Sequence, residues 1–342
     1  MMSSIFNIIS SIFIIIVLNF FFKKKNFLID EKKLKHKSFI TKDLVPLTGG
    51  FVIFFSLLSL NSNYIIFFSS IFLLGVFSDL FVINSPLKKF FVQVIIITLF
   101  LYFSGIRISH TKIFFLDYLL KYKLFAFLFI GVCLLVLING TNFMDGANTL
   151  VCGYYILVLL FVIHISETNR LVYNFNDYYY LLITLIVIFS FNALSKIYLG
   201  DSGSFLLSFV IGYFLIEFFN SNIGIFPSVS SMFIILLLWY PAFENFFSIV
   251  RKIVKNKQPS KPDNFHLHHL LFLYFKKKIQ IDVSFINTLV GCVINIYNLI
   301  IFILGSQLYF HTKYLTCLVI FNILLYLGVY FYFKNKLKSF NT

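Results

Sequence analysis

The polar residues that could do chemistry gather in a few short segments between long apolar runs. In residues 139–148, Asn139 with Asn142, and Asn142 with Asp145, are spaced three apart. Such residues lie along one side of a helix. Amide and carboxylate oxygens there suit a hard cation such as Mg²⁺, or the hydroxyls and base of a nucleotide. An Asn-rich helix end is the plainer interpretation, but the added Asp-Gly-x-Asn at the edge of an apolar run favours function.

A second segment, residues 196–204, reads Lys-Ile-Tyr-Leu-Gly-Asp-Ser-Gly-Ser. It offers a carboxylate, two hydroxyls and backbone N–H groups at the start of a helix, which together predict an anion site. Asp201 in that place can hold a metal that bridges phosphates. A simple helix cap would account for Asp201 or Ser202 alone. Tyr198 is the one aromatic residue that we assign to this cluster.

A third segment begins with Ser78-Asp79 at the end of an apolar run and continues to Lys88. A carboxylate at the end of a membrane span is costly unless it has a partner or water. Lys88 is placed to meet a lipid phosphate. These residues are equally compatible with a role as interfacial anchors.

The fourth segment carries Arg251 and then three histidines, His266, His268 and His269. Histidines on a basic loop bind metal, shuttle protons or donate hydrogen bonds to phosphate. Zinc is disfavoured because no cysteine or second spaced cluster accompanies them. A phosphate-binding loop fits a chain with a formal net charge of +15.

The elements that must position these segments are membrane helices. The chain is 60% hydrophobic and 12% charged, whereas soluble domains are about 25% charged. A spanning helix needs roughly 20 apolar residues. We therefore predict one all-α, polytopic transmembrane helical bundle over residues 1–342, with about 11 spans. They lie near 4–22, 46–61, 64–82, 89–105, 123–141, 149–165, 178–195, 203–219, 229–247, 284–305 and 314–333.

The basic residues set the expected orientation. With the N-terminus outside, 22 of the 28 Lys and Arg residues fall on inside segments, and such an excess marks the cytoplasmic side. The C-terminus is then cytoplasmic. The main cytoplasmic loops are expected at about 23–45, 78–89, 139–149, 194–202 and 248–283. Nucleic acid is excluded as a partner, because the lysines lie in short runs between apolar spans.

In this order, the segments resemble those of the polyprenyl-phosphate N-acetylhexosamine-1-phosphate transferases, glycosyltransferase family 4. The resemblance runs from about Leu28 to Leu271. It implies transfer of a sugar-1-phosphate from a UDP-N-acetylhexosamine to undecaprenyl phosphate, which releases UMP and initiates cell-envelope glycan synthesis. It also implies Mg²⁺, or Mn²⁺ in its place, and a bacterial inner membrane with a cytoplasmic active site. The sugar stays open, and a homodimer is one option for assembly.

The resemblance also assigns roles to individual residues. Asp201 would ligate Mg²⁺, with Asn142 as a second metal ligand, and Tyr198 would stack on uracil. Catalytic roles are implied for Asp79, Lys88, Asp201 and His268. Substrate binding is implied for Asn139, Asp145, Asn148, Tyr198, Arg251, His266 and His269.

One departure from the family pattern bears on function. Ser78 stands where the first carboxylate of an Asp-Asp pair is expected, and a hydroxyl cannot supply that charge. A catalytically impaired homologue is therefore one alternative. Another is a transporter or flippase for a lipid-linked sugar, which would need polar residues near the bilayer midplane and broken helices. Uninterrupted spans with polar residues at one edge argue against it.

Overall fold

The computed structural model of the chain describes residues 2–29, 45–60, 62–108, 110–168, 175–221, 227–258 and 263–339. Most of the expected loop 23–45 and residues 259–262 lie outside the described residues. The described residues form helices and no strand, which confirms the all-α class. The helices are α1 (Met2–Lys25), α2 (Gly49–Leu58), α3 (Ile65–Asp79), α4 (Pro86–Ser104), α5 (Phe114–Leu120), α6 (Lys123–Met144), α7 (Leu150–Thr168), α8 (Asn176–Ala193), α9 (Gly200–Ser221), α10 (Ser231–Leu237), α11 (Trp239–Val254), α12 (Leu267–Lys278), α13 (Val283–Gln307) and α14 (Thr312–Ser339).

Seven of these helices are long and apolar enough to cross a membrane, namely α1, α4, α6, α7, α9, α13 and α14. The pair α10 and α11 would make an eighth span, whereas α2 and α3 are apolar but shorter. The chain is thus a multi-pass membrane protein. Each expected apolar run has a helical counterpart, but the count of eleven spans and the orientation of the termini stay predictions.

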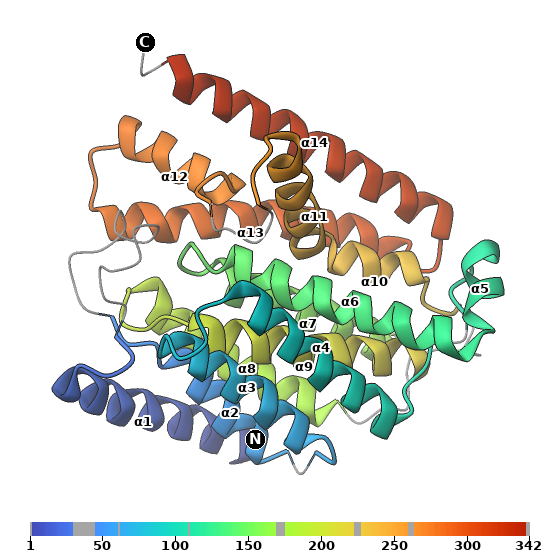
Figure 1. Ribbon diagram of the computed structural model, residues 1–342, viewed down its shortest axis with the longest axis horizontal. Helices are drawn as coiled ribbons and strands as arrows, with labels where there is room; N and C mark the ends of the chain where they lie inside the picture. Colours follow the sequence, from blue (N-terminus) through green and yellow to red (C-terminus); the bar gives the residue numbers. More distant parts are fainter. Residues whose placement is uncertain are drawn as a thin grey trace.

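The expected span at 229–247 is not one uninterrupted helix. It is divided into α10 and α11, which are bent by 70° with Leu238 between them. Pro241 explains the break, because proline has no N–H and its ring clashes with the carbonyl four residues earlier, here Leu237. Within the first turn of α11 the same proline is tolerated. The bend turns α11 away from α10 and sends it along the end of α6 (Figure 1).

Helix α9 forms the centre of the bundle and is buried along almost its whole length. It packs against α3, α6 and α2. Gly75 permits this packing, since a Cβ atom there would lie 2.3 Å from the Ser202 Cα atom. The close approach places the end of α3 directly beside the start of α9.

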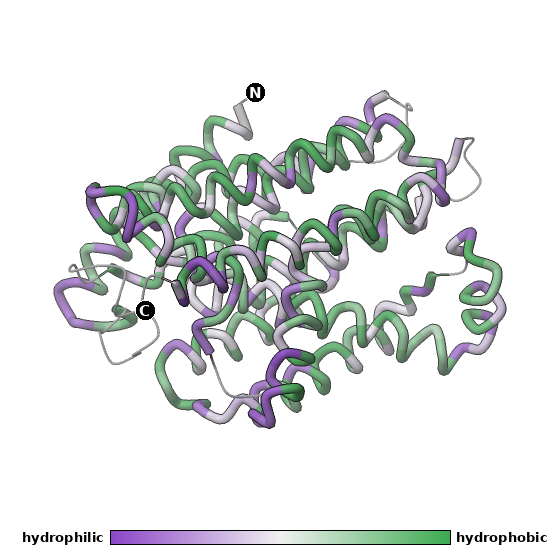
Figure 2. Tube along the Cα trace, turned by 90° about the horizontal axis from the view of Figure 1, so that it is seen from above, coloured by the Kyte–Doolittle hydropathy of each residue, from purple (hydrophilic) through white to green (hydrophobic). Residues whose placement is uncertain are grey.

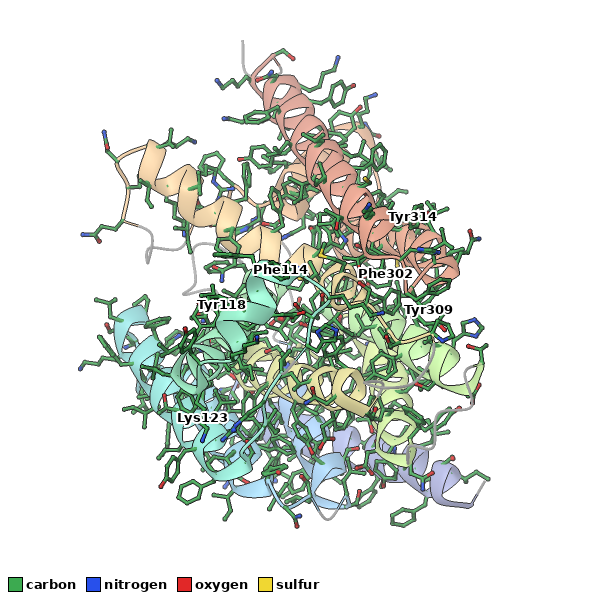
Figure 3. All side chains as sticks on the ribbon, turned by 90° about the vertical axis from the view of Figure 1, so that its right-hand side faces the viewer. Phe114, Tyr118, Lys123, Phe302, Tyr309 and Tyr314 are labelled. Atoms are coloured by element: carbon green, nitrogen blue, oxygen red, sulfur yellow. The ribbon has the colours of Figure 1, made fainter. Side chains whose placement is uncertain are left out.

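The polar segments lie at one end of the bundle. Helices α3, α6 and α8 end there, and α2, α4, α7, α9 and α13 begin there, at the left of Figure 1. Figure 2 shows hydrophobic residues along most of the long helices and hydrophilic ones mainly at their ends and in the connections. At the opposite end, Figure 3 shows α5, whose Phe114 and Tyr118 side chains are exposed. Aromatic residues are typical of membrane boundaries.

Candidate active site

Asp201 is the centre of the candidate site. Its Oδ2 atom accepts hydrogen bonds from the Ser78 hydroxyl and from Lys89 Nζ, the latter at 2.9 Å. Its Oδ1 atom accepts one from Asn142 Nδ2 at 3.2 Å. The side chain is partly exposed. Four elements, α3, α4, α6 and α9, therefore meet at one carboxylate.

Asp79 fixes the start of α9. Its Oδ1 accepts the N–H of Asp201 at 2.8 Å, and its Oδ2 accepts the N–H of Ser202 at 3.0 Å. A carboxylate is stabilised there because the first N–H groups of a helix lack helical partners and carry positive partial charge. The anion site expected from the sequence at this helix start is thus filled by the protein's own carboxylate.

Gly200 makes this cap possible. Its φ of +70° is a left-handed conformation that glycine adopts without steric cost. A Cβ atom there would also lie 2.7 Å from Asp79 Oδ2. The glycine of the Gly-Asp pair in the sequence is therefore explained by the approach of Asp79.

The lysine at Asp201 is Lys89, which the sequence analysis missed, whereas the expected Lys88 is exposed on α4. The spacing of residues along the helix could have identified Lys89 from the sequence. Pro86 begins α4, and residues four apart share a face, so Lys89 lies on the same face as Gln93. Gln93 is buried and accepts a hydrogen bond from Asn139 Nδ2 at 2.9 Å. That face, and not the one carrying Lys88, is turned to the site.

The last turns of α6 join the site to the histidine loop. Asn142 contacts Asp201, while the ring of the next residue, Phe143, lies 5.3 Å from the ring of His266. Just beyond the helix, Gly146 lies against His268, because a Cβ atom there would be 2.4 Å from His268 Nε2. The two polar clusters are thus contiguous through the end of one helix.

The histidine loop is held together by buried charges. Glu244 Oε2 lies 2.9 Å from His266 Nδ1, and Glu244 Oε1 accepts from the Tyr326 hydroxyl at 2.6 Å. Arg251 binds both oxygens of Asp263, at 2.8 and 2.9 Å, and donates to the Phe265 carbonyl. Arg251 and His266, both expected at the substrate, therefore have intramolecular partners that shape the loop.

Burial alone would raise the pKa of Asp263, but Arg251, His266 and Lys252 together outweigh burial and lower that pKa below its usual value. Burial, with His269 and His266 as further causes, lowers the pKa of His268 well below its usual range. Burial and then His266 lower the pKa of His269 to about 3. His268 and His269 are therefore neutral in the folded protein at pH 7.

His268 is the most conspicuous unsatisfied group. It is 1% exposed, and neither ring nitrogen has a hydrogen-bond partner among the described residues. His269 Nδ1 also lacks one. Buried polar groups are nearly always paired, so such groups call for an explanation. Neutral imidazoles against Gly146 can donate to, or accept from, a polar ligand that reaches the 139–149 segment.

The remaining expected site residues lie around these clusters. Tyr198 is half-buried, and its ring packs against the small core of Phe22, Leu28 and Leu47. Asn148 is buried and donates to Ser195 Oγ at 2.7 Å and to Thr288 Oγ1 at 3.3 Å, outside the Asp201 cluster.

Asp145 ends α6, where its N–H donates to the Thr141 carbonyl. It therefore lies between Asn142, which contacts Asp201, and Gly146, which contacts His268.

The groups around Asp201 fit a magnesium ion. Two carboxylates, a hydroxyl and an amide are hard oxygen donors, and a half-turn of the Asn142 amide would present its oxygen in place of its nitrogen. Within the described ranges, no group of three His, Cys, Asp or Glu residues gathers to hold a metal alone. Mg²⁺ in phosphoryl-transfer sites uses one or two carboxylates and completes its shell with substrate phosphates and water.

The geometry supports chemistry at a phosphate. A carboxylate that can hold a cation, a lysine ammonium and neutral imidazoles adjoin one another at the end of the bundle. Phosphoryl transfer requires mainly positioning and charge stabilisation from the protein. Such an arrangement is suited to hold and neutralise a diphosphate.

Comparison with known proteins agrees with this chemistry. Residues 62–219 match the model of Glycosyl transferase family 4. The chain is 28% identical over 279 residues to an undecaprenyl-phosphate alpha-N-acetylglucosaminyl 1-phosphate transferase of Thermotoga maritima, which covers 79% of this chain and 80% of that protein. It is 27% identical over 216 residues to a probable undecaprenyl-phosphate N-acetylglucosaminyl 1-phosphate transferase of Bacillus subtilis, covering 60% of this chain and 56% of the relative.

Proposed function

We propose that this chain, whose residues 62–219 match the model of Glycosyl transferase family 4, is a sugar-1-phosphate transferase of that family. The donor is a UDP-N-acetylhexosamine and the acceptor is undecaprenyl phosphate. An oxygen of the lipid phosphate forms a bond to the β-phosphorus of the donor, and the bond from that phosphorus to UMP breaks. The products are undecaprenyl-diphospho-sugar and UMP, and the step initiates an envelope glycan.

The observation that carries the proposal is the assembly at Asp201. Four separate helices bring a carboxylate, a hydroxyl, an ammonium and an amide to one point at the membrane edge. The names of both relatives give an N-acetylglucosaminyl 1-phosphate group and undecaprenyl phosphate. A lipid acceptor reaches such a site from the membrane, and a nucleotide donor reaches it from water.

Each group has a role in the proposed reaction. Asp79 holds the start of α9 and so aims Asp201. Asp201, with Asn142, would hold Mg²⁺, which when bound supplies neutralisation of the diphosphate charge. Lys89 is positioned to bind an incoming phosphate. His268 and His269, being neutral, would bind polar groups of the donor without repelling cations nearby.

The two alternative functions, a flippase and a catalytically impaired homologue, receive less support from the site. A flippase would require the polar cluster near the midplane of the spans, whereas the groups here lie at helix ends (Figure 1). Ser78 stands where the family pattern has a carboxylate, but its hydroxyl donates a hydrogen bond directly to Asp201. This position therefore still supplies a polar partner to Asp201. We place the active site on the cytoplasmic side, since the orientation expected from the lysines puts this end there.

The test is UMP release by purified protein supplied with undecaprenyl phosphate, Mg²⁺ and a panel of UDP-sugars. We expect release with at least one UDP-N-acetylhexosamine. Asp201→Asn should abolish UMP release. Asp177→Asn makes the same charge change at the start of α8, the end of that helix away from the site, and should keep wild-type turnover. Well-folded protein that releases no UMP with any donor would refute the proposal, and full activity of Asp201→Asn would refute the metal role.

A further inference from the structure

The pairing of Asp201 in the structure is unusual for a group that is to bind a cation. Ser78, Lys89 and Asn142 each donate a hydrogen bond to one of its oxygens. Lys89 contributes a full positive charge 2.9 Å from Oδ2. A divalent cation bound at Oδ2 would compete with this ammonium, because like charges at contact distance repel.

The balance of charge around this oxygen points the same way. Asp79 is occupied by two backbone N–H groups, and Ser78 contributes no charge. Among the described residues, Lys89 thus supplies a positive charge that pairs with Asp201 at Oδ2. Its side chain is 24% exposed, so it can leave Oδ2 for water or another anion without unfolding the helix.

We propose that Lys89 is an exchangeable counter-ion of Asp201, which a divalent cation displaces when it binds. Displacement frees the ammonium, and a phosphate brought in with the metal is the nearest new partner for it. Metal binding and phosphate binding are then coupled through one lysine. The phosphate step rests on the proposed function, whereas the exchange between Lys89 and a metal does not.

The alternative is a fixed structural ion pair. Such pairs usually stabilise little when partly exposed, and the start of α9 is already held by Asp79. A fixed pair also predicts a different outcome on mutation. If Lys89 competes with the metal, removing its charge strengthens metal binding; if it only holds the site in shape, removing it weakens metal binding.

The experiment measures Mn²⁺ binding by electron paramagnetic resonance to purified protein in detergent, with no substrate present. Lys89→Gln should lower the Mn²⁺ dissociation constant about fivefold, the factor expected for a partly exposed ion pair of about 1 kcal/mol. Lys88→Gln is the matched control, because it removes the same charge from an exposed neighbour. It should change the constant less than about twofold.

A second measurement uses the wild-type protein and does not depend on a variant folding. Acylation of lysines by a water-soluble ester, followed by mass spectrometry, reports how free each ammonium is. Saturating Mn²⁺ should increase labelling of Lys89 relative to Lys88. Lys89→Gln should bind Mn²⁺ more tightly than the wild type and yet have a lower kcat. A purely structural role of Lys89 does not produce that combination.

The proposal is overturned if Lys89→Gln binds Mn²⁺ no more tightly than the wild type, or if Lys88→Gln gives the same gain. It is equally overturned if Mn²⁺ leaves the labelling of Lys89 unchanged. If no UDP-sugar yields UMP but these binding results hold, the proposed function fails and the exchange stands. If UMP is released but Lys89→Gln weakens Mn²⁺ binding, the exchange fails and the transferase stands.

Discussion

Replacement of Asp79 by asparagine should separate positioning from metal binding. The carboxylate accepts two backbone N–H groups, from Asp201 at 2.8 Å and Ser202 at 3.0 Å. Asparagine has one acceptor oxygen and an NH₂ group, so one of the two N–H groups would face a donor. Leaving such a group unpaired costs about 1–3 kcal/mol, and loss of the negative charge at the helix start costs about 0.3–1 kcal/mol more. The sum is about 2 kcal/mol for this partly buried site.

The assay compares Asp79→Asn with Asp201→Asn. Thermal unfolding in detergent should occur a few degrees lower for Asp79→Asn, because the start of α9 loses its cap. Asp201→Asn should unfold closer to the wild-type temperature, since its ion pair with Lys89 is partly exposed and the amide keeps one acceptor oxygen. Both should lose turnover. Equal stability of Asp79→Asn and the wild type would refute the capping role of Asp79.

Three further predictions follow from local geometry. Gly200→Ala should lower stability by about 1–2 kcal/mol, since residue 200 has a φ of +70°, whereas Gly328→Ala, with open space around it, should not destabilise; unfolding midpoints compare the two. The pKa of His269 is about 3 in the folded protein and about 6.5 in the unfolded chain. As pH drops from 6.5 toward 3 the unfolded chain therefore binds the proton first, and the free energy of unfolding should fall. A His269→Gln variant measured at pH 7 and pH 5 should show a smaller fall in stability. Arg251→Lys should cost about 2 kcal/mol, because arginine binds the Asp263 carboxylate through one nitrogen and the Phe265 carbonyl through another, and lysine has a single nitrogen; unchanged urea unfolding would contradict this.

The general architecture was predictable from the sequence because apolar run length is a direct consequence of membrane thickness. The location of the Asp201 cluster followed from the same pattern, since residues at successive span ends share a membrane face. The bend at Leu238 was missed although Pro241 is visible in the sequence. An apolar run does not reveal whether a proline ends one helix or begins another.

Partners within the site were harder to predict than its location. Residue type predicted Asp79 and Arg251 as candidate site residues, but it did not predict that Asp79 would cap α9 or that Arg251 would bind Asp263. These contacts join residues far apart in sequence and depend on how helices pack. Only the choice between Lys88 and Lys89 was within reach, from the spacing of a lysine and Gln93 along one helix face.

The end of α6 sets the distance and the angle between the two halves of the site, which are the Asp201 cluster and the histidine loop. Asn142 and Phe143 are adjacent in sequence, so in a helix they point about 100° apart and are offset by about 1.5 Å. One touches Asp201 and the other His266. An alanine inserted between them would rotate one half of the site against the other by about 100° while leaving every side chain intact. Helical pitch therefore sets the distance that a ligand must span to touch both halves. Exchanging single side chains does not alter that spacing of the backbone.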